Sequence, residues 1–211
     1  MTKKTIELHC VTDDYYFSNN NRFIKQIESI LEGGADIIQL RFKAMTKHAF
    51  YSLAKQIKKI TLSYQRKLLI NDHVDLALAI DADGVHLGQQ DLPINIARQL
   101  LGPDKCIGIS INSLKQTHLA LSQSIDYLSI SPLFSTQTKK DATPPLGLEA
   151  LSEIKKLTDK KIITIGGITL SNCSQVINHG ANGIAVCSAI FNSTNAFKES
   201  QKFRRQLDKN K

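Results

Sequence analysis

Apolar and polar positions along this chain follow two different spacings. Short, nearly continuous apolar runs predict buried strands at residues 6–11, 36–40, 67–71, 85–87, 106–109, 127–130, 161–165 and 183–186. Between these runs, apolar residues recur every three or four positions, as on one face of a helix. That spacing predicts helices at residues 19–31, 46–63, 74–80, 93–101, 113–122, 147–157, 169–178 and 195–207, with a single turn at 188–191.

Strands that alternate with helices throughout a chain predict a parallel sheet, because each helix returns the chain to the edge where the next strand begins. Similar segments lead from helix end to strand at residues 34–39, 81–86, 124–129 and 180–185, as expected of a repeating βα array. We therefore predict the α/β class and a single (β/α)8 TIM barrel over residues 1–211, with a basic tail at about 208–211. A chain of 211 residues is near the lower end of the usual size of this fold.

Composition narrows the class of protein. The chain is 42% hydrophobic and 22% charged, which is ordinary for a globular protein and excludes fibrous and disordered classes. We find no apolar stretch of membrane-spanning length and no signal-peptide pattern, so we expect no membrane partner and a cytoplasmic location. The four cysteines are widely spaced without a CxxC pair, which predicts reduced thiols and no structural zinc site.

The formal net charge of +8 raises the question of a nucleic-acid partner. The basic residues are spread along the predicted helices, and aromatic residues do not alternate with them as a base-stacking groove requires. We therefore expect no nucleic-acid partner. Positive potential suits small anionic substrates at least as well, because it attracts phosphates toward a site.

In a barrel of this kind, the active site is built from the loops at the carboxyl ends of the strands. The polar and glycine residues at those ends are Gln39, Arg41, Lys43, Asn71, Asp72, Asp91, Ser110, Thr136, Thr138, Lys139, Gly166, Gly167, Cys187 and Ser188. Each has an alternative structural interpretation. Arg41 and Lys43 are also compatible with surface charges, Ser110 with a helix cap and Gly167 with a turn.

Asp72 and Asp91 follow two strands joined by a very short helical connection. Such strands are parallel neighbours, so both carboxylates lie at the same rim. Mg²⁺ binds one or two carboxylates together with substrate phosphates, which makes this pair a candidate magnesium site. An aspartate after a strand is equally typical of a helix N-cap, and for Asp72 both interpretations stay open.

The opposite part of the predicted rim is rich in exposed backbone. The pair Gly166-Gly167 follows the seventh strand, and a short helix starts at Ser188 after the eighth. Free backbone N–H groups in these positions commonly hold a phosphate in (β/α)8 barrels. Together with the cations and carboxylates across the rim, this arrangement predicts a monophosphate end and a pyrophosphate end, as a two-substrate transfer requires. The connection at 131–145 is unusually long, which is typical of a functional or disordered loop.

With these motifs in place, the chain resembles the thiamine phosphate synthase family, within the thiamine phosphate synthase and thiazole tautomerase superfamily. The matching segments occur in the family's order and span almost the whole chain: Ile38–Arg41, Ile70–Asp72, Asp83–Pro93, Thr136–Asp141, Pro144–Leu148 and Ile165–Ile168. The resemblance implies a transferase that joins an amino-substituted hydroxymethylpyrimidine diphosphate to a thiazole phosphate, or its carboxylated form, and releases pyrophosphate. It also implies Mg²⁺ as cofactor, small-molecule substrates as partners, and allows a homo-oligomer.

Carried over by position, the resemblance assigns a role to each motif residue. Residues implied to contact the pyrimidine diphosphate are Gln39, Arg41, Lys43, Asn71, Ser110 and Lys139, of which Arg41, Lys43, Ser110 and Lys139 are the expected catalytic groups. Asp72 and Asp91 are implied to hold Mg²⁺. Residues implied to hold the thiazole phosphate are Thr136, Thr138, Gly167, Cys187 (through its backbone) and Ser188.

Two positions depart from the family pattern. Phe42 stands where an acidic residue is usual, and Ile111-Asn112 replaces a small polar residue and a histidine. Alternate residues at a strand end face opposite ways, so we expect Phe42 to point away from the ligand. The related thiazole tautomerases use a histidine near Asn112 and have typically lost the carboxylates, so this chain fits the synthases better. A tautomerase-like enzyme and a non-catalytic thiamine phosphate binder stay as alternatives.

Overall fold

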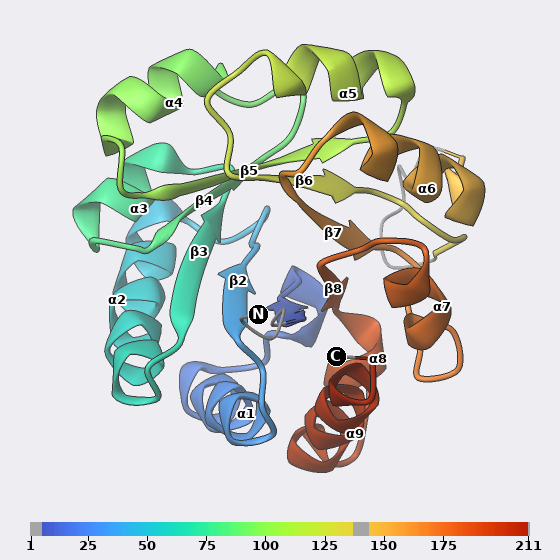
Figure 1. The fold of residues 1–211 in the computed structure, drawn as a ribbon. Coiled ribbons are helices and arrows are strands. Elements are labelled where there is room, and N and C mark those ends of the chain that lie inside the picture. The colour runs from blue at the N-terminus through green and yellow to red at the C-terminus, as the bar shows by residue number, and fades with distance from the viewer. Residues whose placement is uncertain (1–5, 137–143, 211) are drawn as a thin grey trace.

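A computed structural model of the chain describes residues 6–136 and 144–210. Eight parallel strands pair in sequence order, and β1 pairs with β8 to close the ring (Figure 1). The strands are β1 (Glu7–Val11), β2 (Ile37–Leu40), β3 (Lys67–Asn71), β4 (Gly84–Leu87), β5 (Cys106–Ile111), β6 (Tyr127–Ile130), β7 (Lys161–Ile165) and β8 (Gly183–Val186). The predicted (β/α)8 TIM barrel is confirmed.

Helices surround this barrel, and α1 and α9 lie side by side where the chain closes (Figure 1). The helices are α1 (Asn20–Glu32), α2 (Lys47–Ser63), α3 (Val74–Ala79), α4 (Ile94–Leu101), α5 (Leu114–Leu121), α6 (Gly147–Leu157), α7 (Cys173–Asn178), α8 (Ser188–Phe191) and α9 (Ala196–Asp208), with a 3-10 turn, η1, at Asp14–Tyr16. Within residues 6–136 and 144–210, no helix is both long and apolar enough to cross a membrane.

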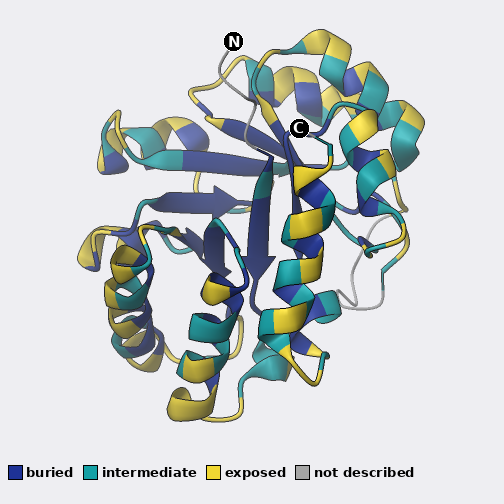
Figure 2. Ribbon diagram, turned by 60° about the horizontal axis from the view of Figure 1, so that its bottom comes forward, coloured by how far each residue is buried: buried dark blue, intermediate teal, exposed yellow. Residues whose placement is uncertain are grey.

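Two apolar cores form because alternate strand residues face opposite sides of the barrel wall. Between strands and helices, a large shell core includes Leu8, Ile38 and Leu68, all fully buried. Inside the barrel, a smaller core contains Val11, Ile37, Leu69, Tyr127, Ile163 and Ala185. In Figure 2, the strands are buried, whereas the helices expose their outer faces. The interior core fills the barrel below the strand ends and leaves the carboxyl rim for binding.

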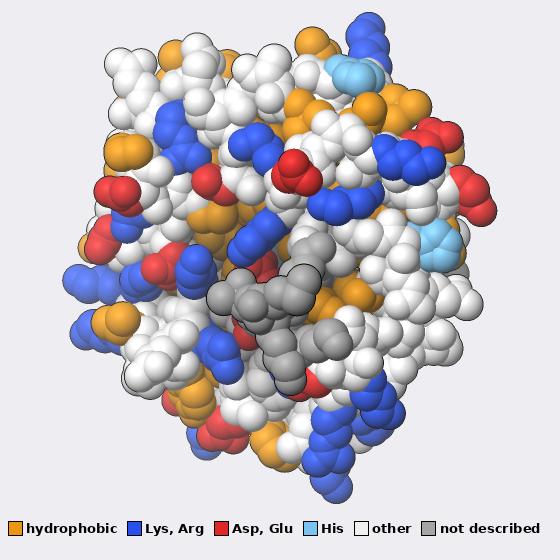
Figure 3. Space-filling model, in the orientation of Figure 1, with side chains coloured by type: hydrophobic (Ala, Val, Ile, Leu, Met, Phe, Trp, Pro, Cys, Tyr) orange, Lys and Arg blue, Asp and Glu red, His pale blue; other side chains and the backbone are white. Residues whose placement is uncertain are grey.

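Most predicted boundaries agree with the structure to within a residue or two. β5 continues to Ile111, beyond its expected end at residue 109, and α7 begins at Cys173 because the three residues before it form turns. The turn η1 was not predicted; the Asp13 side chain accepts a hydrogen bond from Tyr15 N at its start. On the face shown in Figure 3, lysines and arginines are dispersed among acidic and neutral side chains.

Candidate active site

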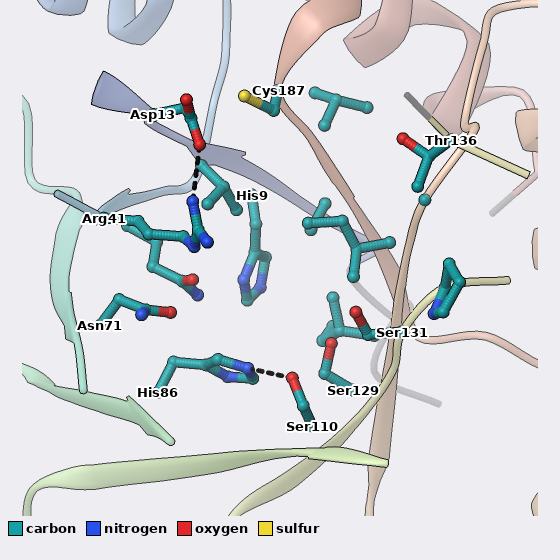
Figure 4. Close-up of a pocket in the computed structure, with 18 of the residues that line it drawn as sticks. His9, Asp13, Arg41, Asn71, His86, Ser110, Ser129, Ser131, Thr136 and Cys187 are labelled. Carbon is teal, nitrogen blue, oxygen red and sulfur yellow. Dashed lines mark hydrogen bonds and ion pairs between the residues drawn. The ribbon is translucent and has the colours of Figure 1, made fainter. Parts of the chain in front are cut away.

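A pocket of about 1010 Å³ opens at the carboxyl ends of the strands. All eight strands or the loops that follow them contribute to its lining, including Val11, Gln39, Asn71, His86, Ser110, Ser129, Ile165 and Val186. Side chains from opposite sides of the barrel point toward one another across it (Figure 4). The pocket has three parts, which differ in the groups that they present: a charged rim, a backbone cradle and a polar floor.

The charged rim contains Arg41, Lys43, Asp72 and Asp91, which follow β2, β3 and β4. Arg41 Nη1 donates a hydrogen bond of 2.6 Å to Asp13 Oδ2, as the dashed line in Figure 4 shows. Lys43 Nζ forms an ion pair with Asp72, although the lysine side chain is 53% exposed. Both cations are therefore held at the pocket edge by carboxylates.

Three consecutive residues after β1, Thr12–Asp14, fix the loop that carries these cations, and we call them the β1 clamp. Thr12 Oγ1 accepts a hydrogen bond of 2.8 Å from the backbone N of Arg41. The Asp14 carboxylate accepts from the backbone N atoms of Lys43 (2.7 Å) and Ala44 (3.2 Å). The clamp thus orients both the backbone and the guanidinium of the β2 loop.

Asp72 and Asp91 lie next to each other at the rim. Burial raises the pKa of Asp91, and the neighbouring Asp72 carboxylate raises it further, against the effect of a 2.6 Å hydrogen bond from Gly88 N to Asp91 Oδ2. Asp72 has a left-handed backbone, φ 65°, and its N donates to the backbone oxygen of His86. A carboxyl group whose ionisation is disfavoured by a neighbouring carboxylate, as for Asp91, is in an arrangement that a cation stabilises.

The carboxylates of Asp72 and Asp91 fit Mg²⁺, which takes further ligands from substrate and water, better than a metal whose ligands all come from the protein. Among residues 6–136 and 144–210, no group of three or more His, Cys, Asp or Glu side chains has metal-binding geometry. A hard cation with two carboxylates needs further oxygen ligands, and Mg²⁺ commonly takes these from substrate phosphates and water. Asp72 and Asp91 are the residues that would hold such an ion.

The backbone cradle lies across the pocket, after β7 and β8, and contains Gly166, Gly167, Cys187 and Ser188. Gly167 has φ +64°, and a Cβ at this position would lie 2.5 Å from the backbone oxygen of Ser135. Only glycine therefore fits between the β6 and β7 loops. Burial raises the pKa of the Cys187 thiol to about 12, which leaves it a neutral side chain at the start of α8.

The polar floor is formed by inward-facing strand residues. His86 hydrogen-bonds through Nδ1 to Tyr127 Oη and through Nε2 to Ser110 Oγ, both at 2.8 Å. Figure 4 shows the contact with Ser110. Gly108 makes room for this network, because a Cβ there would lie 1.9 Å from the Tyr127 ring. His9 lines the same floor from β1. Burial raises the pKa of Tyr127 well above its usual value, so the phenol stays protonated.

The structure also distinguishes several alternatives left open by the sequence. The N-cap position of α3 is His73, and no side chain caps that helix, so Asp72 is not its N-cap. The α5 cap is Ser113 Oγ, whereas Ser110 points into the barrel. Phe42 is 2% exposed and packs against Phe17, Phe23 and Phe50, away from the pocket lining as expected.

Most of the predicted site residues therefore meet in one pocket. Those that line it are Gln39, Arg41, Lys43, Asn71, Asp72, Asp91, Ser110, Thr136, Gly166, Gly167, Cys187 and Ser188. Thr138 and Lys139 lie outside the described residues. Four features of the site were not predicted from the sequence: the β1 clamp, His9, His86 and Ser129. Both histidines occur within apolar runs, where a lone polar residue resembles a satisfied core residue. His86 lies next to the end of β4, where an inward-facing polar residue signals a site, whereas His9 lies in the middle of β1 and carries no such signal.

Comparison with known proteins gives a consistent result. Residues 8–190 match the sequence model of the family described as thiamine monophosphate synthase. The chain is 42% identical over 184 residues to a thiamine-phosphate synthase of Clostridium novyi, covering 87% of this chain and 90% of that protein. It is 38% identical over 210 residues to a thiamine-phosphate synthase of Syntrophomonas wolfei, which covers both chains completely. A solved structure of thiamine phosphate pyrophosphorylase from Pyrococcus furiosus superposes with a TM-score of 0.88 at 31% identity, over 98% of each chain.

Proposed function

Because this chain belongs to the thiamine monophosphate synthase family, we propose that it joins an aminopyrimidine diphosphate to a thiazole phosphate. The pyrimidine substrate carries the amino, methyl and hydroxymethyl-diphosphate groups expected above. The thiazole substrate is the phosphoethyl thiazole or its carboxylated form. The products are thiamine phosphate and pyrophosphate, with carbon dioxide released as well when the thiazole is carboxylated, and the enzyme is a transferase of the pyrimidinylmethyl group.

The observation that carries this proposal is the division of one pocket into a charged rim and a backbone cradle. A pyrophosphate brings several negative charges and suits Arg41, Lys43 and the two rim aspartates with Mg²⁺. A monophosphate suits backbone N–H groups and a helix start, as in the cradle. Since both ends open into the same cavity, the two substrates would meet between them.

At the charged rim, we assign the diphosphate to Arg41 and Lys43, with Lys139 added from the family resemblance. Gln39, Asn71 and Ser110 lie deeper in the pocket and suit the pyrimidine ring. Asp72 and Asp91 would hold Mg²⁺, which when bound would offset the negative charge of the leaving pyrophosphate. The β1 clamp keeps Arg41 and Lys43 oriented while the substrate enters.

At the cradle, we assign the thiazole phosphate to the backbone around Gly167 and Cys187 and to the Ser188 hydroxyl. Thr136 lines the pocket beside this cradle, and Thr138 is added from the resemblance. The protonated Cys187 thiol agrees with a reaction in which the substrates react directly and no protein nucleophile is needed.

In the proposed reaction, the bond between the pyrimidinylmethyl carbon and the pyrophosphate oxygen breaks first, and its electron pair leaves with the pyrophosphate. The amino-substituted ring stabilises the resulting cation, and the thiazole nitrogen lone pair then forms the new C–N bond. Arg41 and Lys43 act on the charge that develops on the leaving group, which is where preorganised electrostatics lowers a barrier most. The two phosphate ends hold the reacting atoms in line.

The direct test is product formation from the two substrates with and without Mg²⁺. We expect thiamine phosphate and pyrophosphate in equal amounts, and only when Mg²⁺ is present. Product formation that is unaffected by a metal chelator would remove the role assigned to Asp72 and Asp91. Binding of the thiazole phosphate without condensation under any metal condition would favour the tautomerase-like or binding-protein alternative.

A further inference from the structure

His9 is a buried histidine on the pocket floor that the proposed reaction leaves without a task. Its side chain is 1% exposed and lines the pocket from the middle of β1 (Figure 4). Nε2 lies 2.9 Å from Glu7 Oε2, two residues earlier on the same face of the strand. Nδ1 is buried, and it has no hydrogen-bond partner in the described part of the chain. A buried polar atom without a partner is costly unless a ligand completes it.

Glu7 decides which ring nitrogen of His9 carries the proton. Burial opposes ionisation of Glu7, but the hydrogen bonds from His9 and Lys161 and the charge of Lys161 favour the carboxylate and lower the pKa of Glu7. The ionised carboxylate can only accept, so Nε2 must donate. In the singly protonated ring, Nδ1 is consequently a lone-pair acceptor. Nδ1 is thus a lone-pair acceptor on a side chain that lines the cavity.

The other histidine of the pocket floor, His86, has a hydrogen-bond partner at each ring nitrogen. His86 uses Nδ1 for Tyr127 and Nε2 for Ser110. The edge of the Tyr127 ring lies against His9, with ring centroids 5.9 Å apart and planes at 70°, which restricts rotation of the imidazole. Of these two histidines, His9 is therefore the one with an acceptor left for a ligand.

We propose that His9 is a specificity residue whose Nδ1 accepts a hydrogen bond from the exocyclic amine of the pyrimidine substrate, and that Glu7 is a positioning residue that sets this tautomer. The inference rests on the proposed function, because it takes the aminopyrimidine as the ring that enters the floor. A pyrimidine with oxygen in place of the amine presents an acceptor to an acceptor and is rejected, whereas one with hydrogen there leaves Nδ1 unsatisfied.

The test compares binding of two ligands to the full chain by calorimetry in the presence of Mg²⁺: the aminopyrimidine diphosphate and its analogue with hydrogen in place of the amine. We expect wild type to prefer the amine by about 10-fold, as for one buried neutral hydrogen bond. His9→Ala should reduce that preference to within about 2-fold and leave thiazole phosphate binding unchanged. His48→Ala, which removes an exposed histidine on α2, serves as the matched control.

Glu7→Gln tests the positioning role while the imidazole stays in place. Nitrogen NMR of histidine-labelled wild type should show a protonated Nε2 and a lone-pair Nδ1, whose resonance moves on addition of the aminopyrimidine diphosphate but not of the hydrogen analogue. An uncharged glutamine can accept from or donate to Nε2, so we expect mixed tautomers and a smaller preference for the amine.

The outcomes separate this inference from the function on which it rests. If His9→Ala weakened the binding of both ligands equally, with no change in the preference for the amine, His9 would be merely structural and the inference would be overturned. A resting tautomer that carries its proton on Nδ1 would overturn it as well. Failure of wild type to form thiamine phosphate would overturn the proposed function instead, and the condensation assay reports that directly.

Discussion

The charged rim and the backbone cradle lie on opposite sides of one pocket, and their proposed phosphate-binding groups are held in place in different ways. At the rim, Arg41 already pairs with Asp13, and Lys43 pairs with Asp72. At the cradle, the proposed binding groups are backbone atoms held by glycine conformation, and Gly167 packs against the β6 loop. The rim is organised by charge, whereas the cradle is organised by shape.

This difference indicates how substitutions at the charged rim and at the backbone cradle would impair the protein. Charged side chains can be exchanged for neutral ones of the same size without moving the backbone, so a rim substitution removes function and preserves structure. The glycines of the cradle have no side chain to exchange, and any added atom displaces the loop. The rim should therefore control turnover, and the cradle should control binding of one substrate together with local stability.

The largest expected effect comes from Asp72→Asn. Asparagine is isosteric and tolerates the left-handed backbone found at this position. Loss of its charge would weaken the proposed Mg²⁺ site and remove the charged partner of Lys43, so we expect kcat to fall by about 100-fold or more. Steady-state kinetics with saturating Mg²⁺ measure this. A kcat within a few-fold of wild type would contradict the assignment of the rim to the leaving pyrophosphate.

Gly167→Ala tests the cradle. The new Cβ would meet the Ser135 oxygen at 2.5 Å and Phe134 Cβ at 2.8 Å, so the loop must shift. We expect KM for thiazole phosphate to rise about 10-fold or more, with affinity for the pyrimidine diphosphate nearly unchanged. The positive φ should also lower the free energy of unfolding by about 1–3 kcal/mol. Equal weakening of both substrates would contradict the separation of the two ends.

The β1 clamp offers a smaller and more selective change. Asp14→Ala removes the acceptor of the Lys43 and Ala44 backbone N–H groups without touching either cation. We expect about a 5-fold rise in KM for the pyrimidine diphosphate and little change for the thiazole phosphate. Asp104→Ala, at an exposed position after α4, is the matched control for loss of one surface charge. A purely structural role of Asp14 would raise both KM values together.

The smallest expected effect is a gain in stability. The pKa of Asp91 is raised in the fold, so the folded state binds its proton more tightly than the unfolded chain does, and stability from this group falls as pH rises through that pKa. At neutral pH and without Mg²⁺, Asp91→Asn should therefore raise the melting temperature by about 2 °C. Asparagine still accepts from Gly88 N. Added Mg²⁺ with pyrophosphate should stabilise wild type but not the variant.

The barrel could be predicted from the sequence because its strands are local apolar runs bounded by turn residues. The same reasoning placed Gln39, Asn71, Asp72 and Asp91 at one rim, since parallel strands end on the same side. Their individual partners could not be predicted. The ion pair between Glu7 and Lys161 joins residues 154 apart along the chain, and it depends on the register with which the ring closes.

The β1 clamp escaped prediction for a related reason. Thr12, Asp13 and Asp14 have the composition of any polar loop, and their function lies in their alignment with another loop 28 to 30 residues later. His9 is ambiguous in the sequence because a strand interior buries both satisfied and ligand-binding polar residues. Only the geometry reveals which nitrogen has been left without a partner.

The pairing of β1 with β8 also affects how the protein is made. The clamp follows the first strand and part of the cradle follows the last, so during synthesis the first strand keeps an unpaired edge until nearly the whole chain has left the ribosome. Contacts of such sequence separation form slowly. Because the clamp and the cradle are brought together only by that final pairing, we expect the proposed substrates to bind the closed ring and not its precursors, and so to favour completed folding.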